Sequence, residues 1–176
     1  MFRKAQSALE FLTTYGWAFL VILIMIGALA YFGVLDPSRF LPDKCLFTTG
    51  ISCDEGFIDS AGPTINARLV NGLGKNIVVD DYADAAALEA ATNVNGGDCN
   101  IAGATLTVEG TANNLIDGTA TGSNWQSGEE ALLAITCTAG DFAEGDRLTV
   151  ETEFTYSEAG STFTKTMQGT IAGAAQ

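Results

Sequence analysis

The sequence contains no histidine, and this absence limits the chemistry available to the chain near neutral pH. Histidine is the only side chain whose ordinary pKa lies near neutrality, and it is the commonest metal ligand. The sequence also lacks a P-loop with its lysine and the spacing of an EF-hand. The carboxylate pairs Asp80-Asp81 and Glu129-Glu130 are best explained as solvated surface. We therefore expect no catalytic residues, no metal and no cofactor.

Basic residues are scarce, with 8 Lys and Arg against 21 Asp and Glu, which gives a net charge of −13. Nucleic-acid binding needs a cationic footprint, so we expect no nucleic-acid partner. The acidity is uneven, because Glu10 is the only acidic residue before Asp36. A solvated surface whose copies repel one another explains the acidic part of the chain.

Charge is missing altogether from residues 11–35, and so is proline. As a helix these 25 residues would measure roughly 37 Å, longer than the ~30 Å hydrocarbon core of a bilayer. A helix that is apolar on every side has to be buried all round, in lipid or in a bundle. Arg3 and Lys4 precede it, so the positive-inside rule leaves the N-terminus in the cytoplasm and the rest outside. Asp36-Pro37 then ends the helix.

Two simple interpretations of this segment are incomplete. A cleaved secretory signal has an apolar region of roughly 7–15 residues and small residues at the cut. Ala28-Leu29-Ala30 supplies such residues, but the run is too long and residues 31–35 would remain as an apolar stub. A plain single-pass anchor fits the length but does not explain Glu10.

A third interpretation explains both features. The N-terminus reads MFRKA-QSALEFLTTYGWAFLVILIMIGALAYFGVLDPS, which resembles the class III signal peptide of archaeal type IV pilins, of the Q-x-S-x-E-F type. The resemblance covers residues 1–53. It implies that a membrane aspartyl prepilin peptidase cuts between Ala5 and Gln6, on the cytoplasmic side. Gln6 would become the new N-terminus, and the apolar helix would stay with the mature protein.

Glu10 has a physical role in this interpretation. A carboxylate beside an apolar helix is costly to bury unless it is paired, and an unpaired one becomes protonated. Cleavage would create an α-amine at Gln6, about one helical turn from Glu10. That amine, on the same or a neighbouring subunit, is the expected partner. The alternative is an interfacial glutamate with no role beyond topology.

Assembly would also involve Phe11, which completes the motif, and the glycines Gly16 and Gly27. Helices packed in lipid or in a dry core gain little from hydrophobicity itself, so close van der Waals contact decides their association. Gly16 and Gly27 provide places for close approach. The alternative is that glycine is simply common in membrane helices.

The four cysteines, Cys45, Cys53, Cys99 and Cys137, all follow the apolar segment. An even number in an exported region indicates two disulfides, whereas a zinc site would need histidine or a C-x-x-C spacing. Three pairings are possible. We favour Cys45–Cys53 because these two are close in sequence, which leaves Cys99–Cys137.

The rest of the chain is expected to form mainly antiparallel strands. Alternating or β-rich patterns predict strands at residues 65–71, 76–79, 104–109 and 131–137, and a hairpin of 148–156 with 161–171. Residues 72–75 are expected to form a hairpin or loop, and 93–98 and 113–124 exposed loops. Residues 80–92 suit a short helix capped by Asp80 or Asp81, or a loop. The expected fold class is α+β: a long N-terminal apolar helix followed by an antiparallel β-sandwich of immunoglobulin-like type.

These patterns divide the chain into a leader (1–5), an apolar helix (6–35), a connector with a disulfide clasp (36–54) and an extracellular β-domain (55–176). The resemblance implies a structural subunit of a helical homo-oligomeric filament, working with a prepilin peptidase and pilus assembly machinery. The subunit would lie in the membrane before assembly and on the archaeal cell surface afterwards, serving adhesion. Three alternatives stay open: a minor pseudopilin-like subunit, a membrane-anchored binding ectodomain that never polymerises, and an archaellum-type filament protein.

Overall fold

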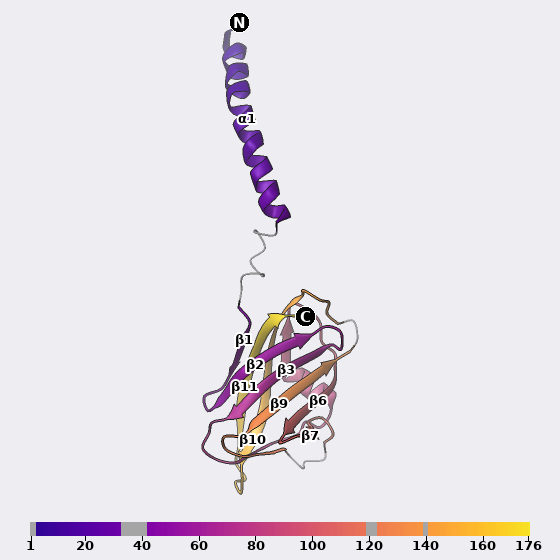
Figure 1. The fold of residues 1–176 in the computed structure, drawn as a ribbon. Coiled ribbons are helices and arrows are strands. Elements are labelled where there is room, and N and C mark those ends of the chain that lie inside the picture. Colours follow the sequence, from indigo (N-terminus) through magenta and orange to yellow (C-terminus); the bar gives the residue numbers. More distant parts are fainter. Residues whose placement is uncertain (1–2, 33–41, 119–122, 139–140) are drawn as a thin grey trace. The chain divides into compact units, whose positions relative to one another are not determined.

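The computed structural model describes residues 3–32, 42–118, 123–138 and 141–176 (Figure 1). The chain divides into two compact units, Met1–Leu41 and Pro42–Gln176. In the first unit, side chains are described for Glu10 and for residues 13–32.

The first unit contains one helix, α1 (Arg3–Tyr31), of 29 residues. Leucine, alanine and methionine favour helix here, and no proline interrupts the run. The amide of Phe32 still bonds the Ala28 carbonyl at 3.0 Å. The helix was expected over residues 6–35, but it already begins at Arg3, and residues 33–35 lie outside the described part of the chain.

The second unit is a sandwich of two antiparallel sheets, which confirms the α+β fold class. We call it the β-domain. Sheet A has the strand order β1 (Lys44–Phe47), β11 (Thr164–Ala174), β10 (Arg147–Glu158), β4 (Ile77–Val79) and β8 (Ser123–Trp125), and β5 (Thr92–Asn95) also pairs with β10. Sheet B has the order β2 (Ile51–Asp59), β3 (Thr64–Asn71), β9 (Glu130–Cys137), β6 (Ile101–Val108) and β7 (Thr111–Asn114).

The core lies between the two sheets and is built by alternation along the strands. In β10 the inward residues Leu148, Val150 and Phe154 are at most 2% exposed. Sheet B contributes Ile65, Leu133 and Ile135 in the same way. Trp125 is fully buried, and its indole N–H donates to the Glu129 carbonyl at 2.8 Å, as a buried tryptophan requires.

The β10–β11 hairpin confirms the strand pair predicted from alternation. Its register runs from Arg147 opposite Ala174 to Ser157 opposite Thr164. The second arm begins at Thr164, three residues later than predicted, so Phe163 lies in the turn and is 80% exposed.

Residues 72–75 do not form a hairpin, because β3 lies in sheet B and β4 in sheet A. The buried Asn71 organises this crossing. Its amide donates to the carbonyls of Lys75 at 2.9 Å and Trp125 at 3.1 Å, and its oxygen accepts from the Leu73 amide at 3.1 Å. Every polar atom of the Asn71 side chain is thereby satisfied, as burial requires.

The predicted helix within residues 80–92 is α2 (Ala85–Ala90), and its N-cap is Asp84 rather than Asp80 or Asp81. The Asp84 carboxylate accepts from the Ala87 amide at 2.9 Å. Asp80 is unsuited to the cap because its amide continues the strand ladder by bonding the Thr155 carbonyl.

Several segments expected to be loops or connector are strands. Residues 93–98 overlap β5, and residues 113–124 overlap β7 and β8. The compact β-domain begins at Pro42 rather than residue 55, because β1 and β2 belong to its two sheets. These strands are held by pairing with partners that are distant in sequence, such as β11 for β1 and β10 for β5, a contribution that local sequence does not reveal.

Candidate functional site

Helix α1 carries the residues predicted for processing and assembly. Ala5, Gln6, Glu10 and Phe11 all lie on it, within its first three turns. The predicted cut between Ala5 and Gln6 therefore falls inside helical backbone. Glu10 is exposed, whereas the side chains of the other three lie outside the described set. The roles of these four residues stay predictions.

In the turn after Glu10, the threonine hydroxyls form hydrogen bonds within the helix. The hydroxyls of Thr13 and Thr14 both donate to the Glu10 carbonyl, at 3.0 and 2.8 Å. Back-bonding of this kind removes the need for water around a threonine hydroxyl in a helix. The threonines therefore do not prevent this end of α1 from entering an apolar environment.

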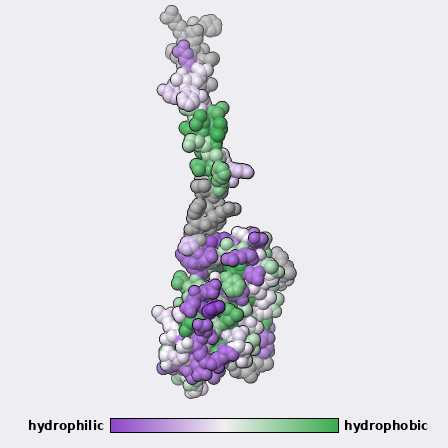
Figure 2. Space-filling model, in the orientation of Figure 1, coloured by the Kyte–Doolittle hydropathy of each residue, from purple (hydrophilic) through white to green (hydrophobic). Residues whose placement is uncertain are grey.

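The segment Thr13–Tyr31 is long and apolar enough to cross a membrane. Its 19 residues correspond to about 28 Å of helix, close to the ~30 Å hydrocarbon core of a bilayer. None of its residues is buried, and Figure 2 shows hydrophobic side chains gathered along α1. Among the described residues of the first unit, nothing covers this surface.

Gly16 and Gly27 lie on this surface with open space around them. A Cβ added at either glycine would meet nothing within 4 Å. They are 11 residues apart, close to three full turns, so they lie on nearly the same side of α1. A second helix could approach the backbone closely along this side.

Aromatic side chains mark both ends of the span. Tyr15 and Trp17 are exposed near its start, and Tyr31 is exposed at its end. The rings of Tyr31 and Phe32 pack edge to face, with their centroids 5.6 Å apart. Tyrosine and tryptophan concentrate at the two interfaces of a bilayer. Their positions suit a helix that spans one.

The four cysteines form Cys45–Cys53 and Cys99–Cys137, the pairing favoured from the sequence. The first bond joins β1 of sheet A to β2 of sheet B, so it links the two layers at their edges. Gly56 makes room for it, since a Cβ there would lie 3.1 Å from the Cβ of Cys45. The second bond ties the segment before β6 to the end of β9.

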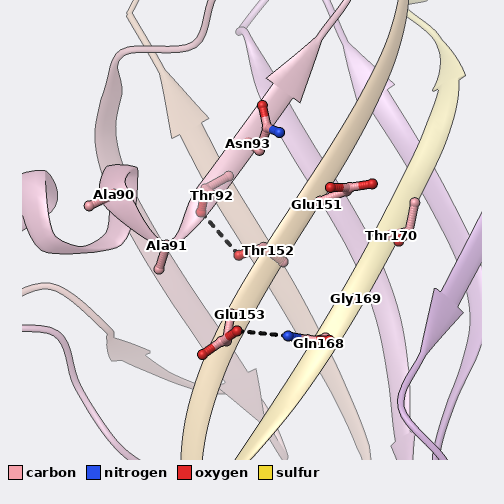
Figure 3. A pocket seen from close by; sticks show the side chains of 10 residues that line it. All are labelled: Ala90, Ala91, Thr92, Asn93, Glu151, Thr152, Glu153, Gln168, Gly169 and Thr170. Carbon is pink, nitrogen blue, oxygen red and sulfur yellow. Dashed lines mark hydrogen bonds between the residues drawn. The ribbon is translucent and has the colours of Figure 1, made fainter.

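A groove on sheet A was not predicted from the sequence. It is a cavity of about 380 Å³ lined by residues 90–93, by residues 151–153 of β10 and by residues 168–170 of β11 (Figure 3). The side-chain amide of Gln168 donates to Glu153 Oε2 at 2.8 Å, and the hydroxyl oxygens of Thr92 and Thr152 lie 3.1 Å apart. Three distant segments build this groove, so no local motif could have found it.

Tyr82 is hydrogen-bonded to the backbone of Glu153, one of the residues that line the groove. Its hydroxyl donates to the backbone oxygen of Glu153. Burial, and secondarily the negative charge of Glu153, raise the pKa of Tyr82 to about 12. The phenol therefore remains a neutral donor throughout the ordinary pH range.

Metal-binding clusters are absent from the part of the chain that the structure describes, since no three His, Cys, Asp or Glu side chains there could hold an ion. Comparisons of the chain with known protein families, with curated proteins and with solved structures found no match.

Proposed function

We propose that this chain is a non-enzymatic structural subunit of a type IV pilus-like surface filament. The observation that carries the proposal is the exposed apolar surface of α1, which contrasts with the closed core of the β-domain. A helix that is apolar all round requires lipid or other helices around it. The N-terminal sequence QSALEF of residues 6–11 adds a route from the first environment to the second, through removal of residues 1–5.

In this proposal the helix has two successive surroundings. Before cleavage Thr13–Tyr31 lies in the bilayer. Afterwards the helices of many subunits pack together, with Glu10 beside the new amine of Gln6 on its own or a neighbouring subunit. The β-domains form the outer wall of the filament and serve adhesion.

The first test is production of the full chain together with a prepilin peptidase. We expect the mature protein to start at Gln6 by mass spectrometry and to form filaments visible by negative-stain microscopy. An exported product that lacks the apolar helix would contradict the proposal. A mature chain that stays in the membrane and never appears in sheared surface material would instead identify an anchored ectodomain.

Glu10→Leu tests the pairing with the amine. We expect the variant to stay in the membrane but to give at least tenfold fewer filaments, since an ammonium without its carboxylate partner is costly to bury. Glu144→Leu, the same change at an exposed site of the β-domain, serves as the control. Normal filaments from Glu10→Leu would remove this role for the side chain.

Gly27→Leu tests close helix packing. The isolated subunit should be unaffected, because the space around the Gly27 Cβ position is open, but filament yield should fall because neighbouring helices can no longer approach. Val21→Leu, an apolar change on the same helix, is the matched control. Equal yields from the two variants would show that Gly27 is not at a helix–helix contact.

A further inference from the structure

The charged side chains that line the groove on sheet A are both acidic, Glu151 and Glu153, and its other polar side chains are neutral amides and hydroxyls. Glu151 and Glu153 point to the same side of β10, because side chains two apart on a strand share a face. The side-chain amide of Gln168 donates one hydrogen bond to Glu153 Oε2, which leaves Glu153 Oε1 and the Gln168 oxygen as acceptors and one Gln168 N–H as a donor. Among the described residues no ion pair includes Glu151 or Glu153.

A ligand for this groove should carry several donors and a positive charge. A primary ammonium has three donors and no acceptor, and its hydrogen bonds to carboxylates are about twice as strong as neutral ones. No aromatic side chain lines the groove, so a flat stacking surface of the kind that suits a sugar ring is missing. The groove therefore favours an ammonium group.

The β-domain presents ammonium groups at the turn between β10 and β11. Lys75 Nζ and Lys165 Nζ lie 2.6 and 2.5 Å from the two carboxylate oxygens of Glu158. Two positive charges share one negative charge, so the cluster has an excess of one positive charge. We call this cluster, together with the neighbouring exposed Phe163, the hairpin tip. Figure 1 places the turn between β10 and β11 at the end of the β-domain opposite the C-terminus.

Charge makes a second copy of the chain the favoured source of the ammonium. Residues 42–176 hold 19 acidic and 5 basic side chains, so β-domains that lie side by side repel unless basic groups of one meet acidic groups of another. The hairpin tip is a projecting basic group, and the groove is a recessed acidic one. Their charges are complementary.

We propose that the groove of one copy receives the Lys165 or Lys75 ammonium from the hairpin tip of a second copy, with Glu151 and Glu153 as its acceptors. This inference rests on the proposed function, because filament formation brings the β-domains together. It assigns a lateral contact to the outer wall of the filament, separate from the packing of α1.

The contact can be tested by zero-length cross-linking of mixed copies. Full-length chain of natural isotope content is combined with an equal amount of ¹⁵N-labelled chain, assembled, and treated with a carbodiimide that joins amines to adjacent carboxylates. We expect mixed-isotope peptides that link Lys165 or Lys75 to Glu151 or Glu153. The link between Lys165 and Glu158 within one copy is the internal control, because these groups are already 2.5 Å apart.

Charge reversal provides the second readout. Lys165→Glu or Glu151→Lys alone should lower the yield of mixed-isotope links in the groove roughly tenfold. The double variant should restore a link between positions 151 and 165 with its polarity reversed. Lys44→Glu, a change at another exposed lysine of the β-domain, should leave the yield unchanged.

Two results would overturn the inference: mixed-isotope links absent while the internal link forms, or mixed-isotope links to the groove that come from Lys44. The same cross-linking on copies held in lipid vesicles without filaments separates the two proposals. Filaments without the groove link contradict this contact and leave the proposed function standing. The groove link in copies that never form filaments supports the contact and contradicts the proposed function.

Discussion

Helix α1 and the β-domain use the same apolar side chains in opposite ways. Leu23 on α1 is 57% exposed and Leu133 in sheet B is 1% exposed, while Ile24 and Ile135 differ as widely, at 62% and 0%. The β-domain covers its apolar residues with its own second sheet. The described residues of the helix leave theirs exposed, with no second layer in the first unit to cover them. The comparison separates a region that is stable by itself from one that depends on its surroundings.

The largest expected effect comes from separating the two regions. A fragment of residues 42–176 should fold with the melting temperature of the full-length β-domain and should lose all association with lipid vesicles, since Thr13–Tyr31 provides the membrane-spanning length. Flotation with vesicles and thermal circular dichroism measure the two properties. A fragment that still floats, or that is unfolded, would break the comparison.

Reduction of the disulfides should affect the β-domain alone, and the two bonds unequally. In the chain-entropy picture, the bond Cys99–Cys137, which spans 38 residues, contributes about 4 kcal/mol. The bond Cys45–Cys53, which spans 8 residues, contributes about 2.5 kcal/mol. Denaturant titration of the two Cys→Ser double variants measures the difference. Equal losses would show that loop length does not control these contributions.

A matched pair of leucine substitutions compares the regions directly. Leu133→Ala should reduce the free energy of unfolding of the β-domain by about 3 kcal/mol, because it leaves a cavity between the sheets. Leu23→Ala should leave that free energy unchanged, since its side chain is exposed on α1. Urea unfolding followed by Trp125 fluorescence reports on the β-domain in both variants. A comparable loss from Leu23→Ala would mean that α1 supports the β-domain.

The smallest expected effect is a loss of stability of the β-domain at low pH. Hydrogen bonds from Lys165 and then Lys75 lower the pKa of Glu158 from 4.5 to about 2. A lowered folded-state pKa adds stability above the unfolded pKa, and this stability is lost as the pH falls towards 2. Glu158→Gln should therefore lower the melting temperature slightly at pH 6 and not at pH 2. Because Glu158 is partly exposed and its two lysine partners are exposed, the change should be small. A difference that persists at pH 2 would exclude the ionic cause.

Sequence patterns predicted the strands whose side chains alternate clearly and missed the short polar ones. In β10, the inward residues from Leu148 to Tyr156 are apolar or aromatic apart from Thr152 at their centre, and they alternate with polar residues, so both the strand and its buried face could be predicted. The strands β5 (TNVN) and β7 (TANN) carry threonine and asparagine that are equally common in loops. Their pairing with β10 and β6 is a tertiary effect.

The same distinction applies to the candidate sites. The apolar helix and its glycines could be read locally, since each depends on neighbouring residues of one segment. The groove could not be read in this way, because Asn93, Glu151 and Gln168 meet only after β5, β10 and β11 have paired. The N-cap was misplaced by three or four residues for a similar reason, since Asp80 and Asp84 differ chiefly in whether a strand partner is nearby.

The pairing of β1 with β11 has a consequence for the timing of folding. Lys44 pairs with Ala172, so the first strand of the β-domain cannot find its neighbour until nearly the whole chain has been made. Contacts between such distant residues slow folding, and until they form, an open strand edge is free to join the wrong partner. In the proposed filament, a subunit that polymerised before β11 had paired with β1 would place an unpaired strand edge next to many identical copies. If the chain polymerises as proposed, the β-domain should therefore mature before the helix is recruited.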